Sequence, residues 1–217
     1  MIESFKINCY PLNRAIRITI SLPKDYNNTN RYYPVVYFLD GQNVFYDKDS
    51  LSGISLDLPS TISRLESEDK YAIYVGIAAA IDETRREKEY KEDILSNFII
   101  DQIHPLLSTR YRMNNYVYSF GCSKASKTAL TIGFSKNFKG AILISPVGNF
   151  KNIEIQTQSK LIYIFAGKTE LDGLCLKNIS DIKNKYDMAQ VKTFDSSIHS
   201  EQGWKNIIYT ALNSLIL

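Results

Sequence analysis

The chain has 217 residues, of which 44% are hydrophobic and 23% are charged, and its formal net charge is +3. A chain of this length is expected to fold as a single domain, residues 1–217, with a full hydrophobic core. Charges of both signs are interspersed, so the composition gives no support for nucleic-acid binding, and it is not that of a disordered chain.

Cysteines and apolar runs bear on where such a protein resides. The three cysteines, Cys9, Cys122 and Cys175, are scattered without a C-x-x-C spacing, so neither a disulfide framework nor a metal site is expected. The N-terminal MIESFKINCY has no basic segment followed by an apolar run, and no apolar run approaches the roughly 20 residues that span a membrane. These features predict a cytoplasmic protein without a membrane partner.

The first half of the chain predicts two kinds of strand. Residues 3–9 and 15–22 alternate apolar and polar side chains, which is typical of an antiparallel pair. Residues 33–39 and 71–78 are continuous apolar runs, which predict strands buried on both faces. The helices expected in this half cover residues 56–65 and 91–107, with a charged loop at 81–90.

The second half of the chain alternates strands with helices. The expected strands cover residues 116–118, 141–145, 161–166 and 190–194, and the expected helices cover 124–133, 174–186 and 204–217. This alternation predicts an α/β fold, a three-layer sandwich with a mostly parallel central sheet. Such sheets place ligands at the carboxyl ends of their strands, and the turn Asp40-Gly41-Gln42-Asn43 follows one of them.

The stretch NYVYSFGCSKAS, residues 115–126, combines a short strand, a sharp turn around Ser123 and the start of a helix. This is the requirement of a nucleophile elbow, which holds a serine in a strained backbone conformation above the edge of the sheet. The residues two before and two after the serine must be small; Gly121 meets this fully, whereas Ala125 adds a methyl group to the usual G-x-S-x-G. Since an ordinary strand-to-helix turn explains the motif equally well, the serine must be tested for partners.

Two histidines are available as the base that a serine nucleophile needs. His104 lies in a predicted helix just before Pro105, upstream of the serine, and is better explained as a structural residue. His199 lies in the polar loop 195–203 after the last strand, from which a side chain can reach the elbow. The order along the chain in this fold is serine, acid, histidine, and His199 is the histidine that fits it.

The acid is expected after the strand 161–166, where the turn from Gly167 offers two carboxylates, Glu170 and Asp172. Asp195 is a further candidate, but it lies beside His199 at the end of another strand. Glu170 is preferred because its longer side chain suits a bridge to a neighbouring loop. Asp172 remains the alternative acid, with a competing role as the N-cap of the following helix.

Six further segments follow one another in a recognisable order. They are LPKDYNNTNRYYPVVYFLDGQNVF, YAIYVGI, RREKEY, IHPLLSTRYRM, GFSKNFKGAILISP and HSEQGW. With the elbow they cover nearly the whole chain, and they resemble the α/β-hydrolase esterases of the esterase D, enterochelin-esterase and feruloyl-esterase type. They include a DGQ-N-x-F turn, an R-x-x-E-Y pattern and a histidine with a tryptophan five residues on; each is moderately specific, and the resemblance depends on all six occurring in the right order.

The resemblance implies a serine carboxylesterase that cleaves small-molecule esters through an acyl-serine intermediate, without a metal or an organic cofactor. It implies Ser123 as nucleophile, His199 as base and Glu170 as acid, three residues after Gly167. The family also includes members with Ser and His alone, so a Ser-His dyad is the alternative to the triad. The resemblance also implies an oxyanion hole made by the backbone N–H groups of Gln42 and Lys124, the second of which begins a helix.

The chain departs from the family pattern at the elbow. Ala125 and Ser126 stand where two glycines are usual, and Lys124 stands where an uncharged side chain is commoner. The Lys124 side chain is expected in solvent at the edge of the cleft, with attraction of an anionic substrate as the alternative. Two rival functions are an acyltransferase with the same triad and an inactive binding protein on a hydrolase scaffold. Neither the natural ester nor the oligomeric state follows from the sequence.

The remaining side chains near these motifs have simpler explanations. Cys122 is expected to be a small buried filler beside the serine, and Trp204 is expected to pack in the core under the histidine loop. Few residues are left for a lid, so an open cleft is expected. The loop 47–58 is the segment that is able to cover it.

Overall fold

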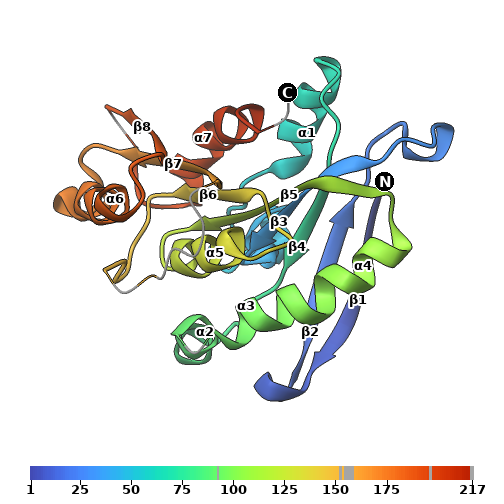
Figure 1. The fold of residues 1–217 in the computed structure, drawn as a ribbon, viewed down its shortest axis with the longest axis horizontal. Coiled ribbons are helices and arrows are strands. Elements are labelled where there is room, and N and C mark those ends of the chain that lie inside the picture. The colour runs from blue at the N-terminus through green and yellow to red at the C-terminus, as the bar shows by residue number, and fades with distance from the viewer. Residues whose placement is uncertain (92, 152, 154–158, 196, 216–217) are drawn as a thin grey trace.

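A computed structural model describes residues 1–91, 93–151, 153, 159–195 and 197–215 of the chain (Figure 1). Its centre is an eight-stranded sheet with the order β1-β2-β4-β3-β5-β6-β7-β8. The strands are β1 Ile2–Cys9, β2 Arg14–Ser21, β3 Tyr33–Leu39, β4 Ile73–Ile77, β5 Met113–Cys122, β6 Gly140–Ile144, β7 Leu161–Gly167 and β8 Gln190–Phe194. β2 pairs antiparallel with β1 and β4, and every other pairing is parallel, which confirms the predicted sheet.

Helices cover both faces of this sheet (Figure 1). They are α1 Leu58–Ser67, α2 Glu83–Lys91, α3 Ile94–Phe98, α4 His104–Arg110, α5 Ala125–Phe134, α6 Leu174–Lys185 and α7 Glu201–Asn213. α1 and α7 pack together over one face, and residues of α3, α5 and α6 share the core on the other face. The predicted three-layer sandwich is therefore confirmed. None of the described helices is long and apolar enough to cross a membrane.

Strand β3 shows why a continuous apolar run is needed at the centre of the sheet. Val35, Tyr37 and Leu39 belong to one hydrophobic core, whereas Val36 and Phe38 belong to the core on the opposite face. Successive side chains of a strand point to opposite faces, so a strand between two helical layers must be apolar at every position. The boundaries predicted for this strand match the structure.

One prediction in the middle of the chain is wrong, and another is confirmed except for a break near its start. The charged stretch 81–90, expected as a loop, contains helix α2, which apolar periodicity does not reveal because its inward side chains are charged or polar. The single helix expected over 91–107 is interrupted at Asp93, whose φ of 52° ends the helical conformation. Helical structure resumes after Asp93 and continues through α3, a π-helical turn Ile99–Ile103 and α4.

Smaller differences affect element ends. Strand β5 extends well beyond the three residues predicted for it, and helix α7 begins three residues before Trp204. The expected C-terminal end of that helix at residues 216–217 lies outside the described residues. These differences leave the order of the elements unchanged, so the carboxyl ends of β3, β5, β6, β7 and β8 lie along one edge of the sheet.

Candidate active site

The turn between β5 and α5 has the backbone of a nucleophile elbow. Ser123 has a φ of 52°, in the left-handed region that a residue with a side chain rarely adopts. Its N–H donates to the Ile144 carbonyl oxygen at 2.9 Å, which ties the turn to the neighbouring strand. A Cβ atom at Gly121 would lie 2.6 Å from the Ala125 carbonyl oxygen, so glycine is required there.

The departures from G-x-S-x-G fit within this turn. The part of Ala125 that approaches Gly121 is its backbone, while the residue as a whole is fully buried. The Ser126 hydroxyl donates to the Gly121 carbonyl oxygen at 3.0 Å, so the side chain that replaces a glycine has a hydrogen bond of its own. Ala125 and Ser126 are therefore compatible with a tight elbow.

Three of the predicted site residues lie together at the carboxyl ends of the strands. His199 Nε2 is 2.8 Å from Ser123 Oγ, and His199 Nδ1 is 3.1 Å from Glu170 Oε2. Glu170 follows β7, and His199 precedes α7 by two residues. Residues up to 76 positions apart thus form a continuous hydrogen-bonded chain from hydroxyl to imidazole to carboxylate.

The Glu170 carboxyl is buried, and its oxygens are hydrogen-bonded. The Gly167 N–H donates to Oε1 at 2.9 Å. Burial by itself raises the pKa of this carboxyl, but hydrogen bonds from His199, Ser145 and the Gly167 N–H outweigh it and lower the pKa to about 2. Glu170 is therefore ionised at neutral pH, the state that holds an imidazole by its Nδ1–H.

Trp204 and Cys175 pack around the imidazole and its carboxylate. The Trp204 ring contacts His199 edge-to-face at a centroid distance of 5.0 Å, and its Nε1–H donates to Ser145 Oγ at 3.0 Å. Cys175 Sγ lies 3.7 Å from His199 Nδ1 and 3.9 Å from Glu170 Oε2. Trp204 is almost fully buried, in agreement with the packing role expected for it.

Glu170, Cys175 and His199 are also the one group in the described residues that has the donor atoms and spacing for a metal ion, within 4.8 Å of one another. Burial raises the pKa of the Cys175 thiol to about 12, so the thiol is protonated at neutral pH and a metal ion would have to displace its proton. His199 and Glu170 already bond to each other. The group is better suited to proton transfer than to metal binding.

The structure separates the other candidates from this group. Asp172 is exposed, and the N-cap of α6 is Gly173, with no side-chain cap bond; the capping role expected for Asp172 is therefore wrong. Asp195 is exposed and pairs with Lys168 at 2.6 Å. His104 Nδ1 contacts the Tyr37 hydroxyl at 3.0 Å, and burial lowers the pKa of the imidazole, as expected for a structural histidine.

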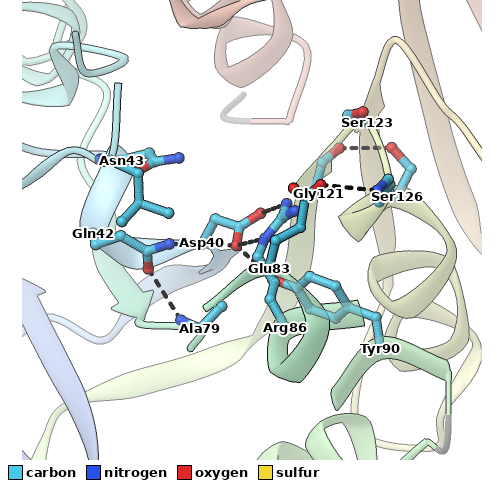
Figure 2. A network of polar contacts seen from close by, with 12 residues as sticks. Asp40, Gln42, Asn43, Ala79, Glu83, Arg86, Tyr90, Gly121, Ser123 and Ser126 are labelled. Carbon is cyan, nitrogen blue, oxygen red and sulfur yellow. Dashed lines mark hydrogen bonds and ion pairs between the residues drawn. The ribbon is translucent and has the colours of Figure 1, made fainter. Parts of the chain in front are cut away.

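The turn after β3 forms the opposite wall of the site (Figure 2). Asp40 has a φ of 53° and leads into a short 3-10 turn, Gly41–Asn43. The Gln42 side chain turns away from the elbow and accepts the Ala79 N–H at 3.0 Å. Lys124 immediately precedes the first turn of α5, and its N–H has no acceptor among the described residues. The binding of an oxyanion by the backbone N–H groups of Gln42 and Lys124 stays a prediction.

Helix α2 braces this turn through the R-x-x-E-Y segment. The Arg86 guanidinium donates to both Asp40 carboxylate oxygens, at 2.7 and 2.6 Å, and the Tyr90 hydroxyl donates to Asp40 at 2.8 Å (Figure 2). Glu89 accepts from Arg14 at 2.6 and 2.8 Å. The spacing of the three motif residues places them on one side of a helix, a signal that apolar periodicity does not detect.

A cleft of about 410 Å³ opens beside Ser123. Its lining includes Asp40, Arg86, Lys124 and Glu201, and the loop residues Leu51, Ser52 and Leu56 contribute one wall, as expected for the segment able to cover the site. Cys122, expected as buried filler, is half-buried and also lines the cleft.

The Lys124 ammonium contacts two carboxylates of α2. It lies 3.2 Å from Glu83 Oε1 and also bonds to Glu87. The hydrogen bonds that Lys124 donates to Glu87 and Glu83 raise the pKa of this lysine. Sequence reasoning missed both partners because it placed them in a loop.

Comparison with known proteins identifies the family of the chain. A family model described as "Putative esterase" matches residues 10–161. The match ends before Glu170 and His199, so the support for these two residues as part of the site comes from the structure. No curated protein matches the sequence.

Solved structures of similar fold have low sequence identity to the chain. A ferulic acid esterase is 16% identical with a TM-score of 0.75, covering 100% of this chain and 98% of its own. An enterochelin esterase from Shigella flexneri is 16% identical with a TM-score of 0.81, and the match covers 99% of this chain and 57% of the esterase. An IroE-like serine hydrolase from Shewanella oneidensis is 15% identical with a TM-score of 0.76, covering 100% and 80%. The chain thus spans little more than half of the enterochelin esterase.

Proposed function

The chain belongs to the esterase family whose model it matches and is an ester hydrolase, and from that premise we propose that it cleaves carboxylic esters through an acyl-serine intermediate on Ser123. The observation that carries the proposal is the chain of hydrogen bonds from Ser123 through His199 to Glu170. A serine hydroxyl is a weak nucleophile until a base removes its proton, and this arrangement supplies the base and the group that orients it.

In the proposed reaction, Ser123 Oγ attacks the ester carbonyl carbon while His199 Nε2 takes the hydroxyl proton. The tetrahedral oxyanion accepts hydrogen bonds from the backbone N–H groups of Gln42 and Lys124. The C–O bond to the alcohol then breaks, and His199 donates its proton to the departing alkoxide. A water molecule, deprotonated by the same imidazole, attacks the acyl-serine. The bond to Ser123 Oγ then breaks, His199 returns the proton to that oxygen, and the carboxylic acid is released.

Glu170 is proposed to hold His199 in the tautomer that this cycle requires. Its carboxylate accepts the Nδ1–H, leaving Nε2 as the acceptor that faces Ser123. The same negative charge stabilises the imidazolium that forms after each proton transfer. No cofactor takes part in any of these steps. The substrate is a small-molecule ester, and aromatic acyl esters of the kind named for the ferulic acid esterase are among the candidates.

The proposal is tested with p-nitrophenyl acetate and butyrate. Ser123→Ala is expected to lower turnover by about a thousandfold or more, because no other group takes the place of the nucleophile. A fluorophosphonate should label Ser123 in the wild-type protein, and His199→Ala should weaken the labelling, whereas His104→Ala should leave it unchanged. Wild-type turnover by a folded Ser123→Ala protein would show that Ser123 is not the nucleophile.

The same assay separates the two rival functions. An inactive scaffold would remain unlabelled by the fluorophosphonate, and an acyltransferase would release p-nitrophenol much faster when an alcohol acceptor is added. A cytoplasmic location is proposed together with the activity, on the grounds that the three cysteines are scattered in the sequence and free in the structure.

A further inference from the structure

The cleft of the candidate active site carries an excess of negative charge. Three carboxylates, Asp40, Glu83 and Glu201, and two cations, Arg86 and Lys124, are among the residues that line it. The charge of such a cleft decides which substrates are attracted, because low-dielectric walls concentrate the field inside it. The pairing of these groups therefore bears on the charge of the ester.

Both cations of the cleft are occupied by carboxylates of the protein. Arg86 makes a two-point ion pair with Asp40, as Figure 2 shows, and both side chains are largely buried. Lys124 contacts Glu83 and Glu87 on helix α2. An anionic substrate would have to compete with these internal partners. This argues against the attraction of an anion by Lys124 that the sequence left open.

Glu201, in contrast, has no cationic partner within the described part of the chain. Its Oε1 accepts from the Asn43 side-chain amide at 2.9 Å and its Oε2 from the Ser52 hydroxyl at 3.3 Å, and both donors are neutral. Lys205, one turn further along α7, pairs with Asp57 at 3.2 Å. Among the described residues, no cationic side chain therefore pairs with Glu201 where it borders the cleft, two residues after His199.

We propose that Glu201 makes this a site for esters that carry a cationic group, a protonated amine or a quaternary ammonium, in the part of the substrate that lies between α7 and the loop 51–56. The proposal rests on the proposed function, since it concerns esters that reach Ser123. Each carboxylate oxygen has two lone pairs, so Glu201 keeps acceptor capacity beyond its bonds to Asn43 and Ser52.

The effect of one charge is large enough to measure. A unit charge about 6 Å from Glu201, at an effective dielectric constant between those of protein and water, changes the specificity constant kcat/KM by about tenfold. A cationic ester is favoured by this factor over a neutral ester of the same shape, and an anionic ester is disfavoured by a similar factor.

The test uses three acetate esters, with hydrolysis followed by acid release at constant pH and low salt. Acetylcholine and 3,3-dimethylbutyl acetate have the same shape and differ by one positive charge, and 4-acetoxybutyrate supplies a negative charge. For the wild-type protein we expect kcat/KM to fall in the order cationic, neutral, anionic, with a cationic-to-neutral ratio of about ten.

The variant Glu201→Gln keeps the size of the side chain and still offers an oxygen that accepts from the Asn43 amide. Because it lacks the negative charge, it should bring the cationic-to-neutral ratio of kcat/KM close to one. Asp195→Asn is the matched control, because it removes an equal charge from an exposed residue outside the cleft. It should leave the ratio unchanged. The ratio rather than the rate is compared, so a general loss of activity in the Gln variant does not affect the conclusion.

Two results would overturn the proposal: equal kcat/KM for the cationic and neutral esters, or a cationic preference that survives in Glu201→Gln. If p-nitrophenyl butyrate is hydrolysed but the three acetates are not, each acetate is tested as an inhibitor of that hydrolysis. The ratios of their inhibition constants then replace the ratios of kcat/KM, and the same two results would overturn the proposal. If no ester, p-nitrophenyl butyrate included, is hydrolysed, the proposed function itself fails. These outcomes separate an error about Glu201 from an error about the reaction.

Discussion

Replacing Glu170 by glutamine is the sharpest test of how the site works. Glutamine keeps the shape of the side chain but removes the negative charge from the buried position beside His199 Nδ1. Two effects follow in the same direction. The amide is free to present N–H₂ to the imidazole and so favour the wrong tautomer, and the imidazolium that forms during each proton transfer loses its counter-charge.

The size of the effect follows from how strongly the surroundings favour the charged carboxyl. Burial raises the pKa of Glu170, yet hydrogen bonds, of which the one from His199 is the largest, bring it from 4.5 to about 2. At about 1.36 kcal/mol per pH unit, this difference corresponds to about 3.4 kcal/mol, of which His199 contributes a part. A loss of that order in imidazolium stabilisation lowers kcat by up to about 300-fold, within the roughly ten- to ten-thousandfold range expected for a misoriented base.

The assay is steady-state hydrolysis of p-nitrophenyl butyrate, with folding checked by urea unfolding. Asp172→Asn is the matched control: Asp172 is exposed, and asparagine tolerates its left-handed backbone (φ 52°), so both kcat and stability should stay within about 0.5 kcal/mol of wild type. Loss of turnover in folded Asp172→Asn, with Glu170→Gln nearly unchanged, would reverse the assignment of the acid. Full activity in both variants would indicate a Ser123–His199 dyad.

Three further predictions concern the framework of the site. Gly121→Ala should lower the free energy of unfolding in urea by about 1–3 kcal/mol, because the added Cβ meets the Ala125 carbonyl. Ala125→Gly restores the common motif and should lower it by only about 1 kcal/mol. Equal effects of the two variants would contradict this account. Arg86→Gln should lower kcat by about 10- to 100-fold, because the turn at Asp40 loses its ion pair. Arg86→Lys should have a kcat between those of the wild type and Arg86→Gln, because lysine keeps the charge but makes no two-point contact. Unchanged kcat in a folded Arg86→Gln protein would show that this ion pair does not serve the reaction. The lowered pKa of Glu170 contributes stability above its unfolded value near 4.5, and this contribution is lost as the pH falls toward about 2, so acid unfolding curves of Glu170→Gln should lack this component; an identical loss of stability in both proteins would refute it.

The sequence was most informative where burial dictates residue type. The continuous apolar run 33–39 gives the boundaries of β3 because both faces of that strand pack against helices. The elbow follows from the steric need for Gly121, and His199 follows from chain order. The contacts of His199 with Ser123 and Glu170 could be established only from the structure, because the periodicity of a sequence does not give the positions of the loops that follow its strands.

Helix α2 shows why the remaining features escaped prediction. Its inward residues are Arg86, Glu89 and Tyr90, which are held by ion pairs and hydrogen bonds. Of the three, Tyr90 alone also packs in the hydrophobic core, so a search for apolar periodicity finds no helix there. The same omission left Lys124 without visible partners, since Glu83 and Glu87 lie on that helix. The error about secondary structure thus hid the two carboxylates that contact the Lys124 ammonium.

The edge of the sheet that carries the site also concentrates backbone strain. Asp40 after β3, Ser123 after β5 and Ser145 after β6 all have left-handed φ values, of 53°, 52° and 48°. Each such residue costs on the order of 1 kcal/mol or more, and it persists only where surrounding contacts fix it. Here those contacts are specific: Asp40 is held by Arg86 and Tyr90, the Ser123 N–H bonds to β6, and the Ser145 N–H donates to the Phe165 carbonyl oxygen at 2.7 Å.

These strained residues have one geometric consequence in common. A left-handed residue directly after a strand turns the chain sharply, so the next peptide N–H groups and side chains face the cleft instead of continuing along the sheet. Ser123 presents its hydroxyl to His199, and Ser145 accepts the Trp204 N–H while it hydrogen-bonds to Glu170. The two hydrophobic cores supply the stability that permits this strain. The site therefore depends on the sheet for its rigidity and on three unfavourable turns for its chemistry.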